Sequence, residues 1–174
     1  MRYKSNQERT AEFFKNFDRY STLRQLVTNK NSVIFDVGAN IGQTSLEMLD
    51  HFPNATVHCF EPITEVFKIL QENTYNKNAI LNNCALSNEQ GELNFYYHKL
   101  SPALSGIHKI NVDSKDSIAI NNPKLAGMNK EYFLQNINDS ITVTSNTLDN
   151  YVNENKIDHI DILKMDVQGA EELV

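Results

Sequence analysis

Residues 33–52 read VIFDVGANIGQTSLEMLDHF, and this stretch decides the fold. Its first five residues, Val33–Val37, are almost wholly apolar, which is typical of a strand that is covered on both faces. A turn with glycines at positions 38 and 42 follows, and the apolar residues beyond it recur with helical spacing until Pro53. A buried strand, a glycine turn and a helix in this order predict the first unit of a parallel α/β sheet.

The chain then repeats the alternation of strand and helix. Apolar runs predict further strands at Thr56–Phe60, Ala79–Leu86 and Ile160–Met165, and Pro62 suits the first turn of a helix between the first two. Alternation of this kind implies parallel pairing with right-handed crossovers. We therefore predict an α/β fold with a doubly wound, mostly parallel sheet.

The segment after residue 86 breaks this rhythm. Every second residue of 93–97 is apolar, and this period of two predicts an added antiparallel strand. Residues 99–140 are polar and rich in Asn and Ser, with one short helix expected near Asn129–Asn136. A short strand at Ile141–Thr144 and a helix capped by Thr147 are predicted to follow.

The N-terminal region carries a stripe of large apolar residues that are three or four positions apart. It predicts an amphipathic helix within residues 1–32, ahead of a single α/β domain of residues 33–174. The stripe suits packing on the chain's own sheet as well as on a neighbouring molecule. Its members are Phe13, Phe17, Tyr20, Leu23 and Val27.

Composition and charge argue against several classes of protein. The chain has 174 residues, a net charge of −6 and a pI near 5.3, and no basic cluster suits a phosphate backbone, so we expect no nucleic-acid partner. No apolar run approaches the roughly 20 residues of a membrane span, and the N-terminus lacks the apolar core of a signal peptide. Cys59 and Cys84 lie in strand-like segments and are expected to be reduced thiols of a cytoplasmic protein. The five histidines show no zinc spacing, so no metal site is predicted.

The glycine turn indicates what the domain binds. In open α/β sheets, ligands lie beyond the carboxyl ends of the strands, where Gly38 and Gly42 allow a ligand to approach the backbone. A dinucleotide-binding turn needs glycines at 38, 40 and 43, but positions 40 and 43 are Asn and Gln. A P-loop needs a lysine after its last glycine, where this chain has Gln43. Neither phosphate-binding pattern is present.

Glu61 ends the second predicted strand, 19 positions beyond Gly42. An acid at about this distance accepts hydrogen bonds from a ribose diol. Alternatively, Glu61 only precedes a helix at Pro62, where the helix dipole favours a carboxylate. Together with a turn that does not suit phosphate, the first interpretation is favoured, and the ligand is then a nucleoside without a pyrophosphate. S-adenosylmethionine fits this description.

Five ordered blocks of sequence resemble one known family. FDVGANIGQTS, CFEP, NCALSNEQGELNFY, NTLDNY and DILKMDVQGAE look like an FkbM-family S-adenosylmethionine-dependent methyltransferase, from about Val33 to the last residue. The resemblance implies a seven-stranded, Rossmann-like sheet of the class I methyltransferase type and O-methylation of a hydroxyl on a sugar or another small-molecule natural product. The family domain continues for several strands after GAE, so we expect that the C-terminal strands are missing from this chain.

The resemblance also implies roles for individual residues. The turn around the methionine part of the cofactor would be formed by Asp36, Gly38, Asn40 and Gly42. Glu61 would hold the ribose hydroxyls, and the backbone near Cys84 and Ala85 would border the adenine.

Asp166 follows the last predicted strand and is the candidate catalytic residue. It would position or deprotonate the acceptor hydroxyl, which is a poor nucleophile until its proton leaves. Alternatively, it caps the helix that Gly169 begins, or it only binds the cofactor. His108, in the segment SPALSGIHKI, is a second candidate base. Lys164 is expected to form a local ion pair with Asp166, and Gln168 stands where the family more often has Glu, which removes a possible base or cation ligand.

Two other functions are kept as alternatives. A non-catalytic fragment that binds S-adenosylmethionine is favoured by the abrupt end after GAEELV. A nicotinamide-dependent oxidoreductase on a related fold is disfavoured because the third glycine of its turn is absent.

Overall fold

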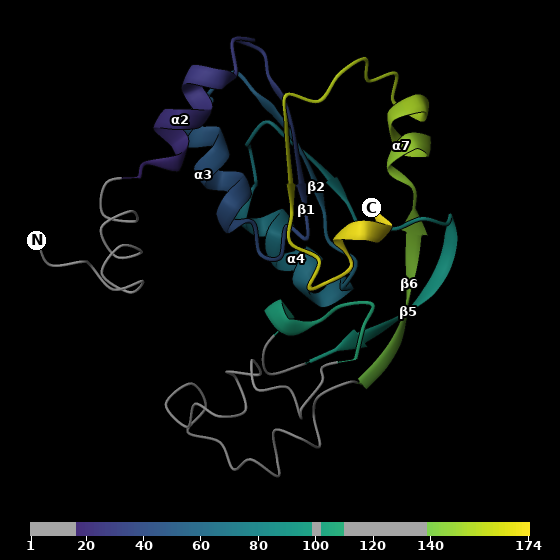
Figure 1. Ribbon diagram of the computed structural model, residues 1–174. Helices are drawn as coiled ribbons and strands as arrows, with labels where there is room; N and C mark the ends of the chain where they lie inside the picture. The colour runs from purple at the N-terminus through teal and green to yellow at the C-terminus, as the bar shows by residue number, and fades with distance from the viewer. Residues whose placement is uncertain (1–16, 99–101, 110–138) are drawn as a thin grey trace, which may run out of the picture.

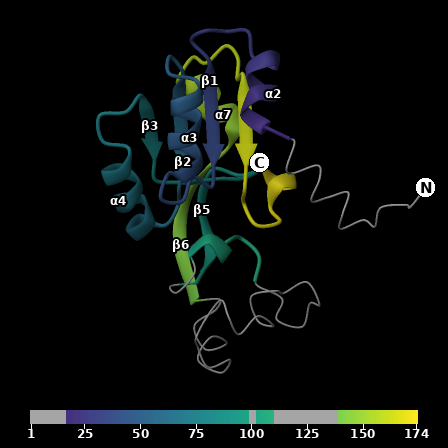
Figure 2. The same ribbon diagram turned by 90° about the vertical axis from the view of Figure 1, so that its left-hand side faces the viewer.

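The structure, a computed structural model, describes residues 17–98, 102–109 and 139–174. Its centre is a sheet of parallel strands in the order β3-β2-β1-β7. Along the chain, β2 and β3 are added on one side of β1, and β7 then pairs with the other side of β1, so the order in which strands are added reverses at β1 (Figure 2). The strands are β1 (Val33–Val37), β2 (Thr56–Phe60), β3 (Ala79–Asn82) and β7 (Ile162–Met165).

Helices cover both faces of this sheet (Figure 1). On one face, Ile34 of β1 packs in a cluster with residues of three helices, and on the other face Phe35 packs against Tyr151 of a fourth. A doubly wound, mostly parallel α/β sheet is therefore confirmed. The first layer consists of α2 (Arg19–Leu26), α3 (Gln43–His51) and α4 (Thr64–Asn73), and the second contains α7 (Leu148–Glu154).

A second, smaller sheet lies beyond the carboxyl ends of the parallel strands (Figures 1 and 2). Its strand order is β4-β6-β5, with β5 antiparallel and β4 parallel to β6. The predicted antiparallel strand is confirmed as β5, and the predicted strand at 141–144 is the middle of a longer β6. The strands are β4 (Ala85–Leu86), β5 (Gly91–Tyr97) and β6 (Asp139–Asn146).

Two predicted segments differ from the structure. The single strand expected at 79–86 is divided between the two sheets, because the side chain of Asn83 donates to the Glu61 carbonyl at 2.8 Å and turns the chain across the end of β2. Pro62 precedes α4 instead of lying in its first turn, because the Glu61 carboxylate accepts from the Ile63 amide at 2.9 Å and keeps Ile63 extended.

The C-terminal segment also differs in part from the predictions. β7 begins at Ile162, two residues later than expected, and the segment after Gly169 forms a 3-10 turn, η2 (Glu171–Leu173), and no α-helix. The helix expected near 129–136 lies outside the described residues. None of the helices in the described part of the chain is long and apolar enough to cross a membrane.

The N-terminal helix packs on the chain's own sheet. Tyr20 is buried, and Leu23 and Val27 contact the same cluster as Met48 of α3. Phe13 lies outside the described residues, and Phe17 is 44% exposed. Of the described members of the apolar stripe, Tyr20, Leu23 and Val27 therefore pack within the molecule.

Thr147 caps the N-terminus of α7, as predicted, and its hydroxyl accepts a hydrogen bond from the amide of Asn150 at 3.1 Å. Replacing Thr147 with alanine is expected to lower the free energy of unfolding by about 1 kcal/mol, because the amide loses its acceptor. Replacement with serine keeps the acceptor and serves as the control. Urea unfolding followed by circular dichroism measures both variants, and equal losses would contradict the capping role.

Candidate active site

A pocket opens at the carboxyl ends of β1, β2 and β7, where the strand order reverses. Ligands of open α/β sheets bind at such a reversal. The predicted site residues that line it are Gly38, Asn40, Glu61, Ala85 and Asp166. Most of the remaining wall is apolar and includes Phe60, Ile63, Leu86, Phe95 and Ile107.

The glycine turn uses its own backbone amides within the protein. The amides of positions 38 and 39 donate to the carbonyl of Phe60 at 3.1 and 3.0 Å, and that of position 40 donates to Oε2 of Glu61 at 3.0 Å. The amides of positions 41 and 42 donate to the side chain of Asn40 at 2.8 Å and to the carbonyl of Ala39 at 2.9 Å. A phosphate is held by amides that point at the ligand. The geometry therefore agrees with the absence of a phosphate-binding pattern.

Gly38 brings this turn into contact with the segment after β7. Its φ is +74°, and a Cβ atom on it would lie 2.1 Å from the carbonyl oxygen of Asp166. Both observations require glycine, since the left-handed conformation disfavours a side chain and the neighbouring atom is backbone. Gly42 has a φ of +92° and precedes α3, away from the pocket wall.

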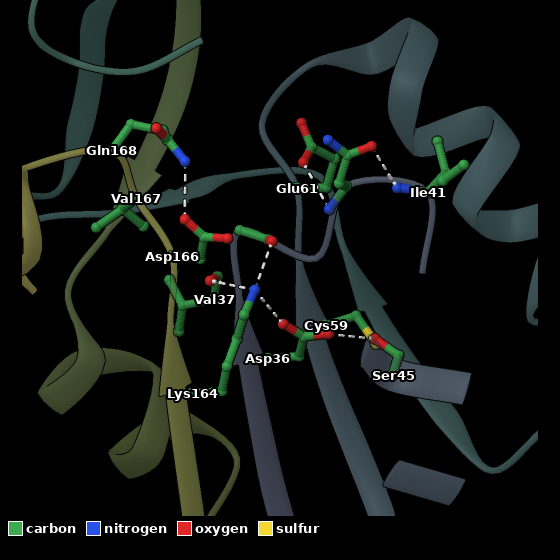
Figure 3. Close-up of polar contacts among 12 residues, drawn as sticks. Asp36, Val37, Ile41, Ser45, Cys59, Glu61, Lys164, Asp166, Val167 and Gln168 are labelled. Atoms are coloured by element: carbon green, nitrogen blue, oxygen red, sulfur yellow. Dashed lines mark hydrogen bonds and ion pairs between the residues drawn. The ribbon is translucent and has the colours of Figure 1, made fainter. Parts of the chain in front are cut away.

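Glu61 is 5% exposed and lies at the inner edge of the pocket. One carboxylate oxygen accepts from the amide of Asn40 at 3.0 Å (Figure 3). The other accepts from the amide of Ile63 at 2.9 Å. Burial raises the pKa of Glu61 to about 7, although these two backbone hydrogen bonds oppose the shift. Each oxygen of a carboxylate accepts more than one hydrogen bond, so the group can also receive donors from a ligand.

Asp36 lies beneath the turn and does not line the pocket. It is fully buried, and its Oδ2 accepts from the Ser45 hydroxyl at 2.6 Å. Its Oδ1 lies 2.8 Å from the ammonium of Lys164 (Figure 3). The local ion pair expected between Lys164 and Asp166 is therefore wrong, because the lysine pairs across β1 and β7 with the residue that stands opposite it in the sheet.

Asp166 lies on the rim of the pocket and is exposed. Its Oδ1 accepts from the side-chain amide of Gln168 at 2.8 Å. The amides of Val167 and Gly169 donate to the carboxylate of Glu171, at 3.3 and 3.4 Å, so Glu171 satisfies the amides that Asp166 was expected to cap. The structure thus leaves Asp166 available to a ligand in the pocket.

Residues 102–109, the described part of the segment SPALSGIHKI, lie along one side of the pocket. They contribute Pro102, Ala103, Ser105 and Ile107 to the wall, whereas His108 is exposed and does not line it. Ser105 accepts from the amide of His98 at 3.0 Å. The sequence pointed to this segment through His108 as a second candidate base, and the residues that face the pocket were not predicted.

Two features of the site were not predicted. Phe95 of β5 contributes to the wall, and the only sequence signal for it is its place in the alternating pattern of that strand. The partner of Lys164 was also missed, since nothing in the local sequence pairs β1 with β7.

Charged groups on the pocket wall are few. Among the described lining residues, Glu61 and Asp166 are the charged side chains, and both are acidic. Both cysteines are free thiols, and Cys84 lines the pocket while Cys59 is buried behind it. In the described ranges, no group of three or more His, Cys, Asp or Glu residues is arranged to hold a metal ion.

Comparison with known proteins identifies the family of this domain. The methyltransferase FkbM domain matches residues 36–174. The 31-O-demethyl-FK506 methyltransferase FkbM of Streptomyces tacrolimicus is 28% identical over 154 residues, which cover 82% of this chain and 57% of that protein. The methyltransferase sdnD of Sordaria araneosa is 30% identical over 155 residues, which cover 81% of this chain and 58% of that protein. The 2-O-methyltransferase NoeI of Sinorhizobium fredii is 29% identical over 178 residues, with coverage of 96% and 68%.

The chain therefore spans somewhat more than half of the length of the first two of these relatives. The family match begins at Asp36, within β1, and continues through both sheets to the last residue, so it includes the pocket and the glycine turn. This chain belongs to the FkbM methyltransferase domain family.

Proposed function

We propose that the domain binds S-adenosylmethionine in this pocket and transfers the methyl group to a hydroxyl of a sugar or another small molecule. Glu61 carries the proposal, because it places a buried carboxylate beside a glycine turn whose amides are already used. A carboxylate accepts the two hydrogen bonds of a ribose diol, whereas a phosphate would need amides that this turn does not offer. Membership of a methyltransferase family supports the same ligand.

The charges on the pocket wall fit this cofactor. S-adenosylmethionine has a positively charged sulfonium and ammonium, and the charged groups on the described wall, Glu61 and Asp166, are acidic. A nicotinamide dinucleotide also carries a pyrophosphate, which would need amides that this turn already uses within the protein. The turn therefore argues against the alternative of a nicotinamide-dependent oxidoreductase.

The residues of the pocket divide into three roles. The carboxylate of Glu61 holds the ribose hydroxyls, and the backbone at Gly38 and Asn40 adjoins the methionine part. An apolar wall encloses the flat adenine ring and excludes water. That wall is formed by Phe60, Ile63, Ala85 and Leu86.

Asp166 is the proposed base for the acceptor hydroxyl. When bound, the cofactor supplies an electrophilic methyl carbon on a sulfonium leaving group, so no covalent intermediate with the enzyme is needed. Gln168 holds Oδ1 of Asp166 in place, and Oδ2 is the oxygen that we assign to the acceptor's proton. The protein's main task is to hold the acceptor oxygen in line with the methyl carbon, at about 3 Å, and to exclude water.

The names of the relatives guide the choice of acceptor. One relative is a 2-O-methyltransferase, and another acts on 31-O-demethyl-FK506. Both names specify transfer to oxygen, which agrees with a carboxylate base on the rim. For this chain we therefore propose a neutral hydroxyl compound as the acceptor. Release of S-adenosylhomocysteine in the presence of such acceptors would distinguish an enzyme from a non-catalytic binding domain.

Calorimetric titration with S-adenosylhomocysteine at pH 6, 7 and 8 tests the cofactor site. The ribose diol needs the ionised form of Glu61, whose pKa in the unliganded protein is about 7. Protonation therefore competes with the ligand below pH 7, and the affinity is expected to rise about tenfold between pH 6 and 8 and then to level off. The absence of binding by folded protein at every pH would overturn the proposed function.

A further inference from the structure

Lys164 lies beneath the glycine turn, on β7, where it stands opposite Asp36 of β1. Its ammonium is 2.8 Å from Oδ1 of Asp36, 2.9 Å from the carbonyl oxygen of Gly38 and 3.4 Å from that of Val37 (Figure 3). The lysine side chain is 22% exposed, so this cation is largely removed from water. An ammonium has three N–H groups, which matches the three oxygens around it.

These contacts complete the support of the glycine turn. The amides of positions 38, 39 and 40 all donate toward the end of β2, to the Phe60 carbonyl and the Glu61 carboxylate. The carbonyl of Gly38 instead accepts from Lys164 on β7, and the carbonyl of Val37 accepts from Lys164 and, at 3.0 Å, from the amide of Asp166. The turn is thus held by acceptors at the end of β2 on one side and by donors from β7 on the other, of which Lys164 is the one that reaches Gly38. Glu61 reaches the same turn through Asn40, so its orientation depends on where the turn lies.

We propose that Lys164 is a positioning residue for the cofactor: it holds the carbonyls of Val37 and Gly38 and thereby fixes the turn and the Glu61 carboxylate for binding. This inference rests on the proposed function, because it concerns the same site. Lys164 does not line the pocket, so it acts through the turn and not on the ligand directly.

A purely structural role for Lys164 makes a different prediction. In that case the lysine only neutralises Asp36, and removal of both charges would restore the site. Asp36→Asn alone keeps the ammonium that serves the two carbonyls. The double variant Asp36→Asn with Lys164→Met removes both charges of the ion pair, and it also leaves the carbonyl of Gly38 without its donor. Lys164→Met alone is unsuitable, since it leaves a buried carboxylate unpaired.

Two measurements are made on the wild type, Asp36→Asn, the double variant and Lys68→Met, which removes an exposed lysine of α4. The first is calorimetric titration with S-adenosylhomocysteine, and the second is amide hydrogen exchange of the unliganded protein. We expect Lys68→Met to bind within a few fold of wild type, and Asp36→Asn, which keeps the ammonium on the two carbonyls, to bind more tightly than the double variant. The double variant is expected to bind about ten- to a hundredfold more weakly, as for a lost hydrogen bond to a charged group. Its amides at 38–40 should exchange faster, while those of β2 stay protected.

The outcomes separate the two proposals. Wild-type affinity and unchanged exchange at 38–40 in a folded double variant would overturn the positioning role. If wild-type protein does not bind S-adenosylhomocysteine, the proposed function fails, and unchanged exchange at 38–40 would then refute the support of the turn as well. Should the double variant not fold, D36N/K164Q replaces it, because its two amides can pair where the ions stood and the Gly38 carbonyl still loses the ammonium.

Discussion

Gly38→Ala is expected to lower the free energy of unfolding by roughly 3 kcal/mol or more and to abolish cofactor binding. A methyl group at this position would lie 2.1 Å from the carbonyl oxygen of Asp166, and the φ of +74° disfavours any side chain. The contact is with backbone, so no rotamer change relieves it. Either β1 and β7 separate at their carboxyl ends or the turn moves, and both responses displace the pocket wall. Urea unfolding and titration with S-adenosylhomocysteine measure the two effects.

Gly169→Ala is the matched control for this substitution. Gly169 has a similar φ of +89°, but a Cβ on it would meet nothing within 4 Å. It therefore reports the cost of the left-handed conformation alone, about 1–2 kcal/mol. The difference between the two alanine variants measures the clash with Asp166. Equal losses of stability would show that β1 and β7 do not approach as closely as the structure has them.

Glu61→Ala is expected to weaken binding of S-adenosylhomocysteine by about 3 kcal/mol, more than a hundredfold, because two ribose hydroxyls lose a charged acceptor. The amides of Asn40 and Ile63 lose the same acceptor, so the variant should also be less stable. Glu65→Ala removes an exposed carboxylate from the first turn of α4 and serves as the control. Wild-type affinity in a folded Glu61→Ala protein would exclude the ribose role.

The pH dependence of stability provides a second readout for Glu61. Its pKa is about 7 in the folded protein and near 4.5 when exposed, so the folded state binds the proton more tightly. The contribution of Glu61 protonation to the free energy of unfolding is fully present below pH 4.5 and is lost as the pH rises through 7. Wild type should thus lose stability across this range, relative to Glu61→Ala. A gain of stability over this range would show that the folded state lowers the pKa of Glu61, and no difference between the two proteins would show that burial does not shift it.

The parallel core of the fold was predictable because local sequence determines it. The apolar runs at 33–37 and 56–60 match β1 and β2 at both ends, since strands that are buried on two faces need an uninterrupted apolar run. The sequence also indicated that the glycine turn and Glu61 lie close together, because a parallel sheet brings the carboxyl ends of its strands to one edge. The structure places Gly38, Asn40, Glu61, Ala85 and Asp166 around one pocket, whereas Asp36 and Gly42 do not line it, and the binding roles of these residues stay predictions.

The errors arose where a distant residue decides the local structure. The strand expected at 79–86 is divided because Asn83 bonds to the backbone at the end of β2. Lys164 and Asp166 share a strand face by spacing, yet the lysine binds Asp36, which the sheet and not the sequence brings near. The apolar wall from residues 102–107 depends on the packing of the second sheet. Such contacts leave no periodicity in the sequence.

The pairing of β1 with β7 also has a consequence for how the protein folds. Lys164 and Val37, which meet under the glycine turn, are 127 positions apart in the chain. Contacts of such large sequence separation form slowly, because the entropy of closing the loop is lost before the contact contributes stability. The β1–β2–β3 half of the sheet can form early during synthesis, but the support of the proposed cofactor site forms only after β7 has been made. Competence to bind the proposed cofactor should therefore appear as a late event in refolding, after most of the helical signal has recovered.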